Sequence, residues 1–172
     1  GLTKLGVETV PPLVARGVLL DMTTHYDSPV IKEGTAFNRA QIQAVADAQG
    51  VEIREGDVVL FHTGWLSLIK SDPARYSAGQ PGLGVDGARY LAELGVVAVG
   101  ADNWGVEAIP FETGSGVFEV HQELLAKNGT YLLENMSTSA LAADKAYEFM
   151  FVLGVARITG AVQMIVNPIA IR

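Results

Sequence analysis

Four short apolar runs, each ending in or followed by a polar side chain, constrain the fold of this chain more than any other feature. Runs of this length without a polar interruption are typical of strands that are covered on both faces of a sheet. In α/β folds, a polar residue directly after such a strand lies at the edge where sites are built. The runs are residues 17–21, which end in Asp21, 58–61 before His62, 96–101 before Asp102 and 131–133 before Glu134.

The segments between these runs predict helices. Residues 39–48 are amphipathic, with Asn38 as the N-cap and Gly50 as the stop, and residues 86–94 end at Gly95. Strand, helix and strand at this spacing indicate right-handed parallel crossovers. We therefore predict one α/β domain over residues 1–172. Two more helices are expected, one at 117–127 and a brief one that is capped by Ser137 or Ser139 and ends at Ala143. Further strands are expected at 147–158 and 167–171, and long loops at 23–35 and 71–84.

Composition excludes several classes of protein. The chain has 172 residues, 49% of them hydrophobic, which is enough for one domain with a buried core. Its 12 Lys and Arg against 19 Asp and Glu give a net charge of −7 without a basic stripe, so nucleic acid is not expected as a partner. No apolar run reaches the ~20 residues that cross a bilayer. Cysteine is absent, so any metal needs His and carboxylate ligands.

His121 and Glu134 are the first candidates for metal ligands. His121 lies beside the apolar positions of the predicted third helix, where a hydrogen-bonded structural histidine is the alternative. Glu134 follows a predicted strand, and one turn and that strand separate it from His121. This connection can bring an imidazole and a carboxylate to one divalent ion. A catalytic metal usually takes three or more protein ligands, so others must come from elsewhere.

Asp102, Trp65 and Trp104 are candidates for substrate binding at strand ends. Asp102 either faces the site or forms an Asx turn or cap that fixes the following loop. The two tryptophans either plug the end of the sheet or form the wall of a pocket for a flat apolar substrate. His62 lies directly before residues 63–65, and we expect no partner carboxylate that would orient it as a base.

His25 and Asp27 form a second possible pair of metal ligands. Side chains two positions apart point to one side of an extended backbone, which would direct both toward one ion. The alternative is a polar surface loop, because Asp, Ser and Pro are typical loop residues.

Taken in order, these motifs resemble the cyclase-like metal-dependent hydrolases, a family that includes bacterial kynurenine formamidase and isatin hydrolase. The resemblance implies a swivelling β/β/α fold, with a mixed, partly parallel sheet flanked by helices. It also implies hydrolysis of an N-formyl amide, lactam or lactone with Zn²⁺ or Mn²⁺, and His121 and Glu134 as metal ligands. The motifs are Arg-Gly-Val-Leu-Leu-Asp at 16–21, 56–60 with Thr-Gly-Trp at 63–65, 100–107, His-Gln-Glu-Leu-Leu at 121–125, Glu-Asn at 134–135 and 142–171.

The N-terminal ligand motif of that family, His-x-Gly-Thr-His-x-Asp-x-Pro-x-His, has only a partial match at residues 24–29. Its first histidine corresponds to Asp21, and its last, the proton-transfer group, corresponds to Ile31. Either His25 and Asp27 are degenerate remnants of the motif, or the motif lies upstream of Gly1. Because residues 16–21 resemble the strand that follows the motif in the family, we expect this chain to be the C-terminal part of a longer protein.

The resemblance predicts a metal-dependent amidohydrolase with an incomplete site in this chain and a small, aromatic substrate. The alternative is a non-catalytic homologue that binds a small molecule or a partner. We expect association, as a homo-oligomer or with the missing N-terminal segment, because one small sheet cannot easily cover so many apolar strands. We expect a cytoplasmic location, and no membrane partner because no apolar run is long enough to cross a bilayer.

Overall fold

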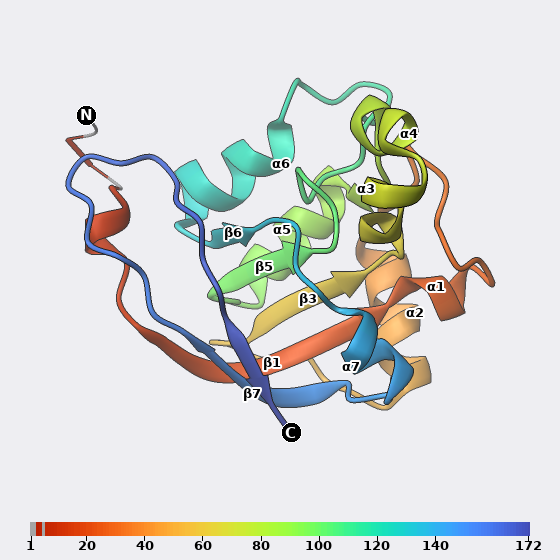
Figure 1. Ribbon diagram of the computed structural model, residues 1–172, viewed down its shortest axis with the longest axis horizontal. Coiled ribbons are helices and arrows are strands. Elements are labelled where there is room, and N and C mark those ends of the chain that lie inside the picture. The colour runs from red at the N-terminus through yellow and green to blue at the C-terminus, as the bar shows by residue number, and fades with distance from the viewer. Residues whose placement is uncertain (1–2, 5) are drawn as a thin grey trace.

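The computed structural model describes residues 3–4 and 6–172, so residues 1, 2 and 5 of the predicted domain lie outside the described residues. Its centre is a six-stranded sheet with the strand order β6-β5-β3-β1-β7-β8 (Figure 1). The first four strands in this order are parallel to one another, and β7 and β8 are antiparallel to their neighbours. This confirms the predicted α/β class with a mixed sheet. The strands are β1 (Leu13–Asp21), β3 (Val58–His62), β5 (Ala98–Ala101), β6 (Tyr131–Leu133), β7 (Glu148–Leu153) and β8 (Ile169–Ile171).

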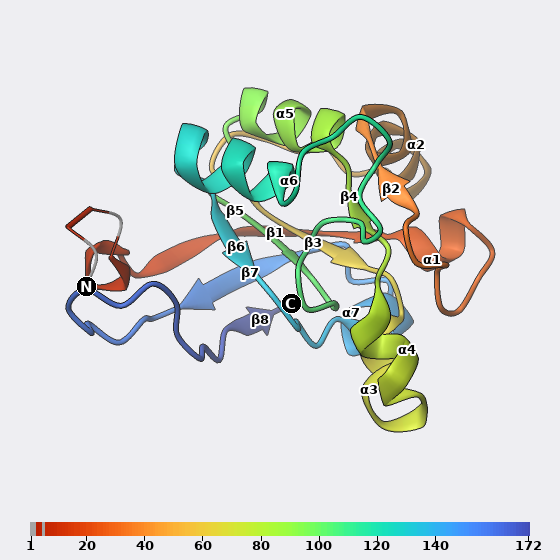
Figure 2. The ribbon, with the colours of Figure 1, turned by 90° about the horizontal axis from the view of Figure 1, so that it is seen from above.

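Helices cover one face of the parallel half of the sheet, as the view from above shows (Figure 2). They are α2 (Arg39–Gln49), α5 (Val85–Glu93) and α6 (Glu119–His121), which continues as the π-helical turn η3 (Gln122–Lys127). The opposite face packs against the C-terminal segment and α7 (Ser139–Ala143). Alternation along the strands divides the core accordingly: Val18 and Leu20 lie under the helices, and Leu19 lies in the second cluster.

The predicted start and stop of α2 are confirmed. The backbone N–H of Asn38 donates to Gln41 Oε1 at 3.1 Å, as in a capping box. Gly50 ends the helix in the left-handed conformation, with φ of 69°, which a glycine adopts without a steric penalty.

The two predicted long loops contain regular structure, because tertiary contacts organise residues that show no periodic pattern. Asp21 caps the short helix α1 (Met22–His25). Residues 71–84 contain α4 (Pro73–Ala78), capped by Asp72, and β4 (Gly82–Leu83), which pairs with β2 (Ala36–Phe37). The other short elements are η1 (Val7–Thr9), η2 (Trp65–Ser67) and α3 (Leu68–Ser71).

Four other predicted elements were too long. The third helix begins at Glu119 and not at residue 117, and the strand before Asp102 begins at Ala98. The long strand from 147 ends at Leu153, and the last strand begins at Ile169 and not at residue 167. Apolar residues beyond these ends are buried in some cases, such as Val96, and exposed in others, such as Val117, so apolar character alone does not mark the ends.

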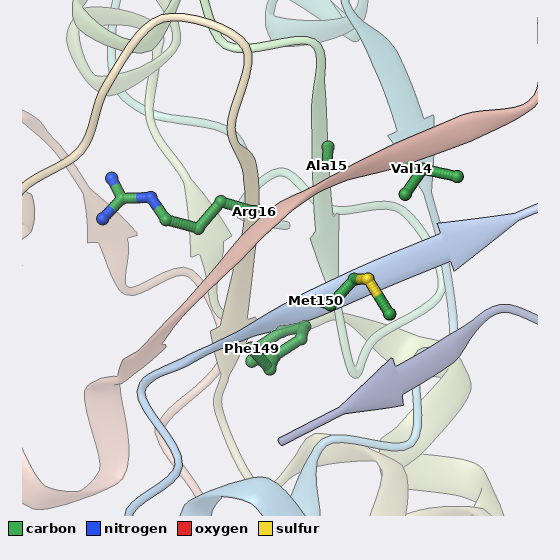
Figure 3. Close-up of a pocket in the computed structure, with 5 residues that line it drawn as sticks. All are labelled: Val14, Ala15, Arg16, Phe149 and Met150. Carbon is green, nitrogen blue, oxygen red and sulfur yellow. The ribbon is translucent and has the colours of Figure 1, made fainter.

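Part of the sheet remains open on the face that carries the helices. Directly opposite residues of antiparallel strands point to the same side, so Met150 shares this face with Arg16 and Ile171. Figure 3 shows the shallow groove between β1 and β7, lined by Val14, Ala15, Arg16, Phe149 and Met150. Among the described residues, no helix has the length and hydropathy that would let it cross a membrane.

Candidate functional site

Polar side chains gather where the four parallel strands end. Asp21 and His62 are register partners at the ends of β1 and β3. Asp102 follows β5 and Glu134 follows β6, and these strands are the next two in the sheet. The carboxyl edge predicted from the sequence therefore exists as one continuous row.

Asp102 anchors the loop that leaves β3. Its carboxylate is buried, with 2% of the residue exposed. Oδ1 accepts hydrogen bonds from the backbone N–H and the hydroxyl of Thr63, at 2.9 and 2.5 Å, and Oδ2 accepts one from the backbone N–H of Gly64 at 2.8 Å. Asp102 thus fixes the loop after β3, and not the loop that follows it in the sequence, as the capping alternative expected.

His62 has a partner carboxylate, contrary to the sequence-based expectation. Its Nδ1 lies 3.2 Å from Asp102 Oδ2 and 2.8 Å from the hydroxyl oxygen of Thr138. The expectation was wrong because Asp102 is distant in the sequence and becomes a neighbour only through the parallel pairing of β3 with β5.

His121 lies between two carboxylates. Its Nδ1 makes a hydrogen bond to Glu107 Oε1, and its Nε2 lies 3.7 Å from Glu134 Oε1. Glu107 is buried in the loop after β5, whereas 40% of the Glu134 side chain is exposed. The sequence analysis missed Glu107, which lies within one of the family-like motifs but has no local pattern that marks it.

These contacts change the protonation of His121. Burial lowers the pKa of the imidazole, but the hydrogen bond to Glu107 and the negative charges of Glu107 and Glu134 raise it more, to about 9. The ring is therefore a cation at neutral pH when only protein groups surround it.

The His121 and Glu134 side chains fit two positions of a divalent metal site. Typical Zn–N and Zn–O bonds add up to about 4.0 to 4.3 Å, which exceeds the 3.7 Å between Nε2 and Oε1, so one ion can bind both atoms. Glu107 on Nδ1 matches the carboxylate that commonly orients a metal-binding histidine. Within residues 3–4 and 6–172, no group of three or more His, Asp and Glu side chains is close enough to hold an ion.

An aromatic cluster borders this site through α4. The backbone oxygen of Tyr76 accepts hydrogen bonds from the indole N–H groups of Trp65 and Trp104, at 3.3 and 2.9 Å. The Tyr76 hydroxyl donates to Asn135 Oδ1, next to Glu134. Trp65 is fully buried, which favours the interpretation that it plugs the end of the sheet, and Trp104 is half-buried.

His25 and Asp27 lie apart from His121. Both are exposed, and His25 packs edge-on against the Tyr26 ring. The ends of β1 and β6 are three strand spacings apart, about 14 Å, and α1 and α6 lie well separated in both views (Figures 1 and 2). The geometry is that of the surface-loop alternative, and it does not bring this pair to the other candidate ligands.

Comparison with known proteins identifies the family. The family model described as "Putative cyclase" matches residues 3–108, which is more than half of the chain.

This chain belongs to the cyclase family.

Solved structures agree with this assignment. A crystal structure of a novel cyclase is 30% identical to this cyclase with a TM-score of 0.88, and the match covers 100% of this chain and 59% of that one. Two isatin hydrolases share the fold. One, bound to the product analogue thioisatinate, has 21% identity and a TM-score of 0.70 over 92% of this chain and 60% of its own. Isatin hydrolase A from Ralstonia solanacearum has 20% identity and a TM-score of 0.77, over 96% and 63%. No curated protein matches the cyclase sequence.

The cyclase spans about 60% of the length of these structures. Its two paired candidate ligands, His121 and Glu134, both follow residue 108, where the family match ends.

Proposed function

We propose that this protein is a metal-dependent hydrolase that cleaves the amide, lactam or lactone bond of a small aromatic molecule, such as an N-formyl amide. The observation that carries the proposal is the arrangement of His121, with Glu107 on Nδ1 and Glu134 near Nε2. Membership of the cyclase family and the fold shared with isatin hydrolases support the same class of reaction.

His121 and Glu134 would hold the ion, which we propose to be Zn²⁺ or Mn²⁺. When bound, such an ion supplies a water with a pKa lowered towards ~7 and polarises the substrate carbonyl. Glu107 keeps His121 Nδ1 protonated and thereby directs Nε2 toward the ion. His121 would have to lose its Nε2 proton in order to bind the ion, because the pKa of the imidazole is raised to about 9.

Tyr76 and Trp104 are the proposed wall for the aromatic part of the substrate. Trp104 is half-buried, and its indole N–H is bound to the Tyr76 backbone, so the ring cannot rotate freely. Tyr76 is tied to Asn135 beside Glu134, which places this wall next to the candidate ligands. An aromatic face of this kind suits a flat apolar substrate.

Metal content measured together with hydrolysis tests the proposal. We expect His121→Ala and Glu134→Ala each to reduce zinc or manganese bound per chain, whereas His25→Ala leaves the content unchanged. The 172-residue chain alone should bind metal weakly and show no turnover of an N-formyl aromatic amide, because its described residues bring together only two ligands. Stoichiometric metal with turnover that His25→Ala or Asp27→Ala abolishes would show that these two residues belong to the site.

The small number of ligands also favours one alternative, a homologue that binds a small molecule or a partner without turnover. Metal content and product formation, measured together, distinguish the two functions. Metal together with hydrolysis, both lost in His121→Ala, supports the enzyme. Binding of an aromatic amide without metal or product supports the non-catalytic protein.

A further inference from the structure

A second imidazole–carboxylate pair lies at the same sheet edge and has no role in the proposed metal site. His62 ends β3, and its Nδ1 lies between Asp102 Oδ2 and the Thr138 hydroxyl. Two other parts of the fold therefore hold one nitrogen of this ring: the residue after β5 and the N-cap of α7.

The partners of Asp102 favour one tautomer of His62. Every hydrogen bond that Asp102 makes with Thr63 and Gly64 uses a carboxylate oxygen as the acceptor. An acceptor next to Nδ1 places the ring proton on that nitrogen. The hydroxyl oxygen of Thr138 can accept from the same N–H. The neutral ring then has its lone pair on Nε2, which lies on the side of the ring away from both partners.

Carboxylates lie on the strands on both sides of His62. Asp21 is the register partner of His62 on β1, and Asp102 faces it from the end of β5.

Tyr76 connects this pair with the proposed metal site. Its hydroxyl binds Asn135, the residue after Glu134. Burial raises the pKa of Tyr76, and the negative charges of Asp102 and Glu134 raise it further. The end of β3 is two strand spacings, roughly 10 Å, from the end of β6, a span that a small aromatic amide can bridge.

We propose that His62 is a proton-transfer residue of the same site, with Asp102 and Thr138 as positioning residues. The inference rests on the proposed hydrolase function. His62 Nε2 accepts a proton from water as the water oxygen forms a bond to the substrate carbonyl carbon and the C=O π pair moves to the oxygen. The imidazolium then returns the proton to the leaving nitrogen or oxygen as the C–N or C–O bond breaks.

Nitrogen-detected NMR of the metal-free chain tests the positioning part without catalysis. We expect His62 to show the tautomer with a proton on Nδ1 and a bare Nε2, and Asp102→Asn or Thr138→Val to shift the population toward the other tautomer. Thr113→Val, at an exposed threonine, is the matched control and should leave it unchanged. If the wild-type ring has its proton on Nε2, with Thr138 donating to Nδ1, the inference is overturned. Thr138→Val and Thr138→Ser remain informative where Asp102→Asn does not fold.

Kinetics of the metal-loaded protein test the proton transfer. We expect His62→Asn to retain its metal and KM but to lose about 10²- to 10⁴-fold in kcat, with partial rescue by added imidazole. An unchanged kcat, or a loss of metal equal to that of His121→Ala, would overturn the role of His62. Absence of turnover in the wild-type protein would instead refute the proposed hydrolase function. The NMR experiment would then still test whether Asp102 and Thr138 position His62, because it does not depend on catalysis.

Discussion

Glu107 binds His121 Nδ1 and so leaves Nε2 as the nitrogen that faces Glu134, 3.7 Å away. The two residues come from the loop after β5 and the end of α6. Asp102 and His62 repeat the same relationship one strand away, with the carboxylate on Nδ1. The carboxyl edge of this cyclase thus orients two histidines in the same way.

Replacement of Glu107 tests the orientation of His121. Glu107→Gln removes a negative charge from Nδ1, so we expect the pKa of His121 to fall from about 9 toward its ordinary value of 6.5. Metal affinity should fall by about 10- to 100-fold, since the imidazole loses the partner that orients it. An NMR titration of His121 and a zinc-binding isotherm measure the two effects.

Glu119→Gln is the matched control for this variant. Glu119 lies on the same helix but pairs with Arg89 and not with His121. A comparable fall in zinc affinity in both variants would mean that general charge near the helix, and not the Glu107 contact, determines binding.

The pH dependence of stability gives a second test of His121. Its pKa is raised on folding, from 6.5 to about 9, so the stabilisation is fully present below pH 6.5 and is lost as the pH rises through 9. The contribution is about 3 kcal/mol at most. Urea unfolding of the metal-free chain at pH 6 and pH 10 should show this difference, and His121→Gln should remove it. If the unfolding free energy of His121→Gln changes with pH as much as that of the wild-type chain, groups other than His121 cause the pH dependence.

Alanine variants of Trp65 and Trp104 should distinguish a role in packing from a role in substrate binding. Trp65 is fully buried, so Trp65→Ala should cost about 3 to 5 kcal/mol of unfolding free energy by leaving a cavity. Trp104→Ala, at a half-buried position, should cost less and raise the KM for aromatic substrates. Thermal unfolding and steady-state kinetics of both variants measure this. A raised KM with an unchanged melting temperature for Trp65→Ala would instead place Trp65 in the pocket.

Two glycines with the same backbone conformation test how tightly the loop after β3 is held. Gly64 has φ of 75°, and a Cβ there would lie 1.9 Å from the backbone oxygen of Pro29. Gly56 has φ of 83°, with no atom within 4 Å of such a Cβ. We expect Gly64→Ala to cost about 2 to 4 kcal/mol and Gly56→Ala about 1 kcal/mol, measured by urea unfolding. If both variants lose the same unfolding free energy, the positive φ alone causes the loss, and the loop after β3 moves to make room for the Cβ.

Association of the chain remains a prediction. On the open face of the sheet, Met150 is 44% exposed and Ile171, its register partner, 48%. Met150→Lys should lower the molar mass seen in light scattering if this face is the contact, whereas Ile165→Lys, at an exposed position outside the strands, should not. A compact monomer in the wild-type chain without any partner would contradict the expectation.

The sequence by itself determined the elements whose signals are local. The apolar runs before His62, Asp102 and Glu134 are strands, Asn38 and Gly50 bound α2, and the three polar residues leave the same edge of the sheet. These features depend on neighbouring residues only, because strand burial, capping and glycine turns act over a few positions.

Only the tertiary structure decided which of these residues meet. The pairs His62–Asp102 and Glu107–His121 arise from strand order and from packing of α6 on the sheet, neither of which has a local signal. The same holds for Trp65, whose place after a buried strand fits a pocket wall or a plug equally well until α4 covers it. Contacts between distant segments depend on how the whole chain buries its apolar surface, so the identity of each partner is fixed by the fold and not by the adjacent sequence.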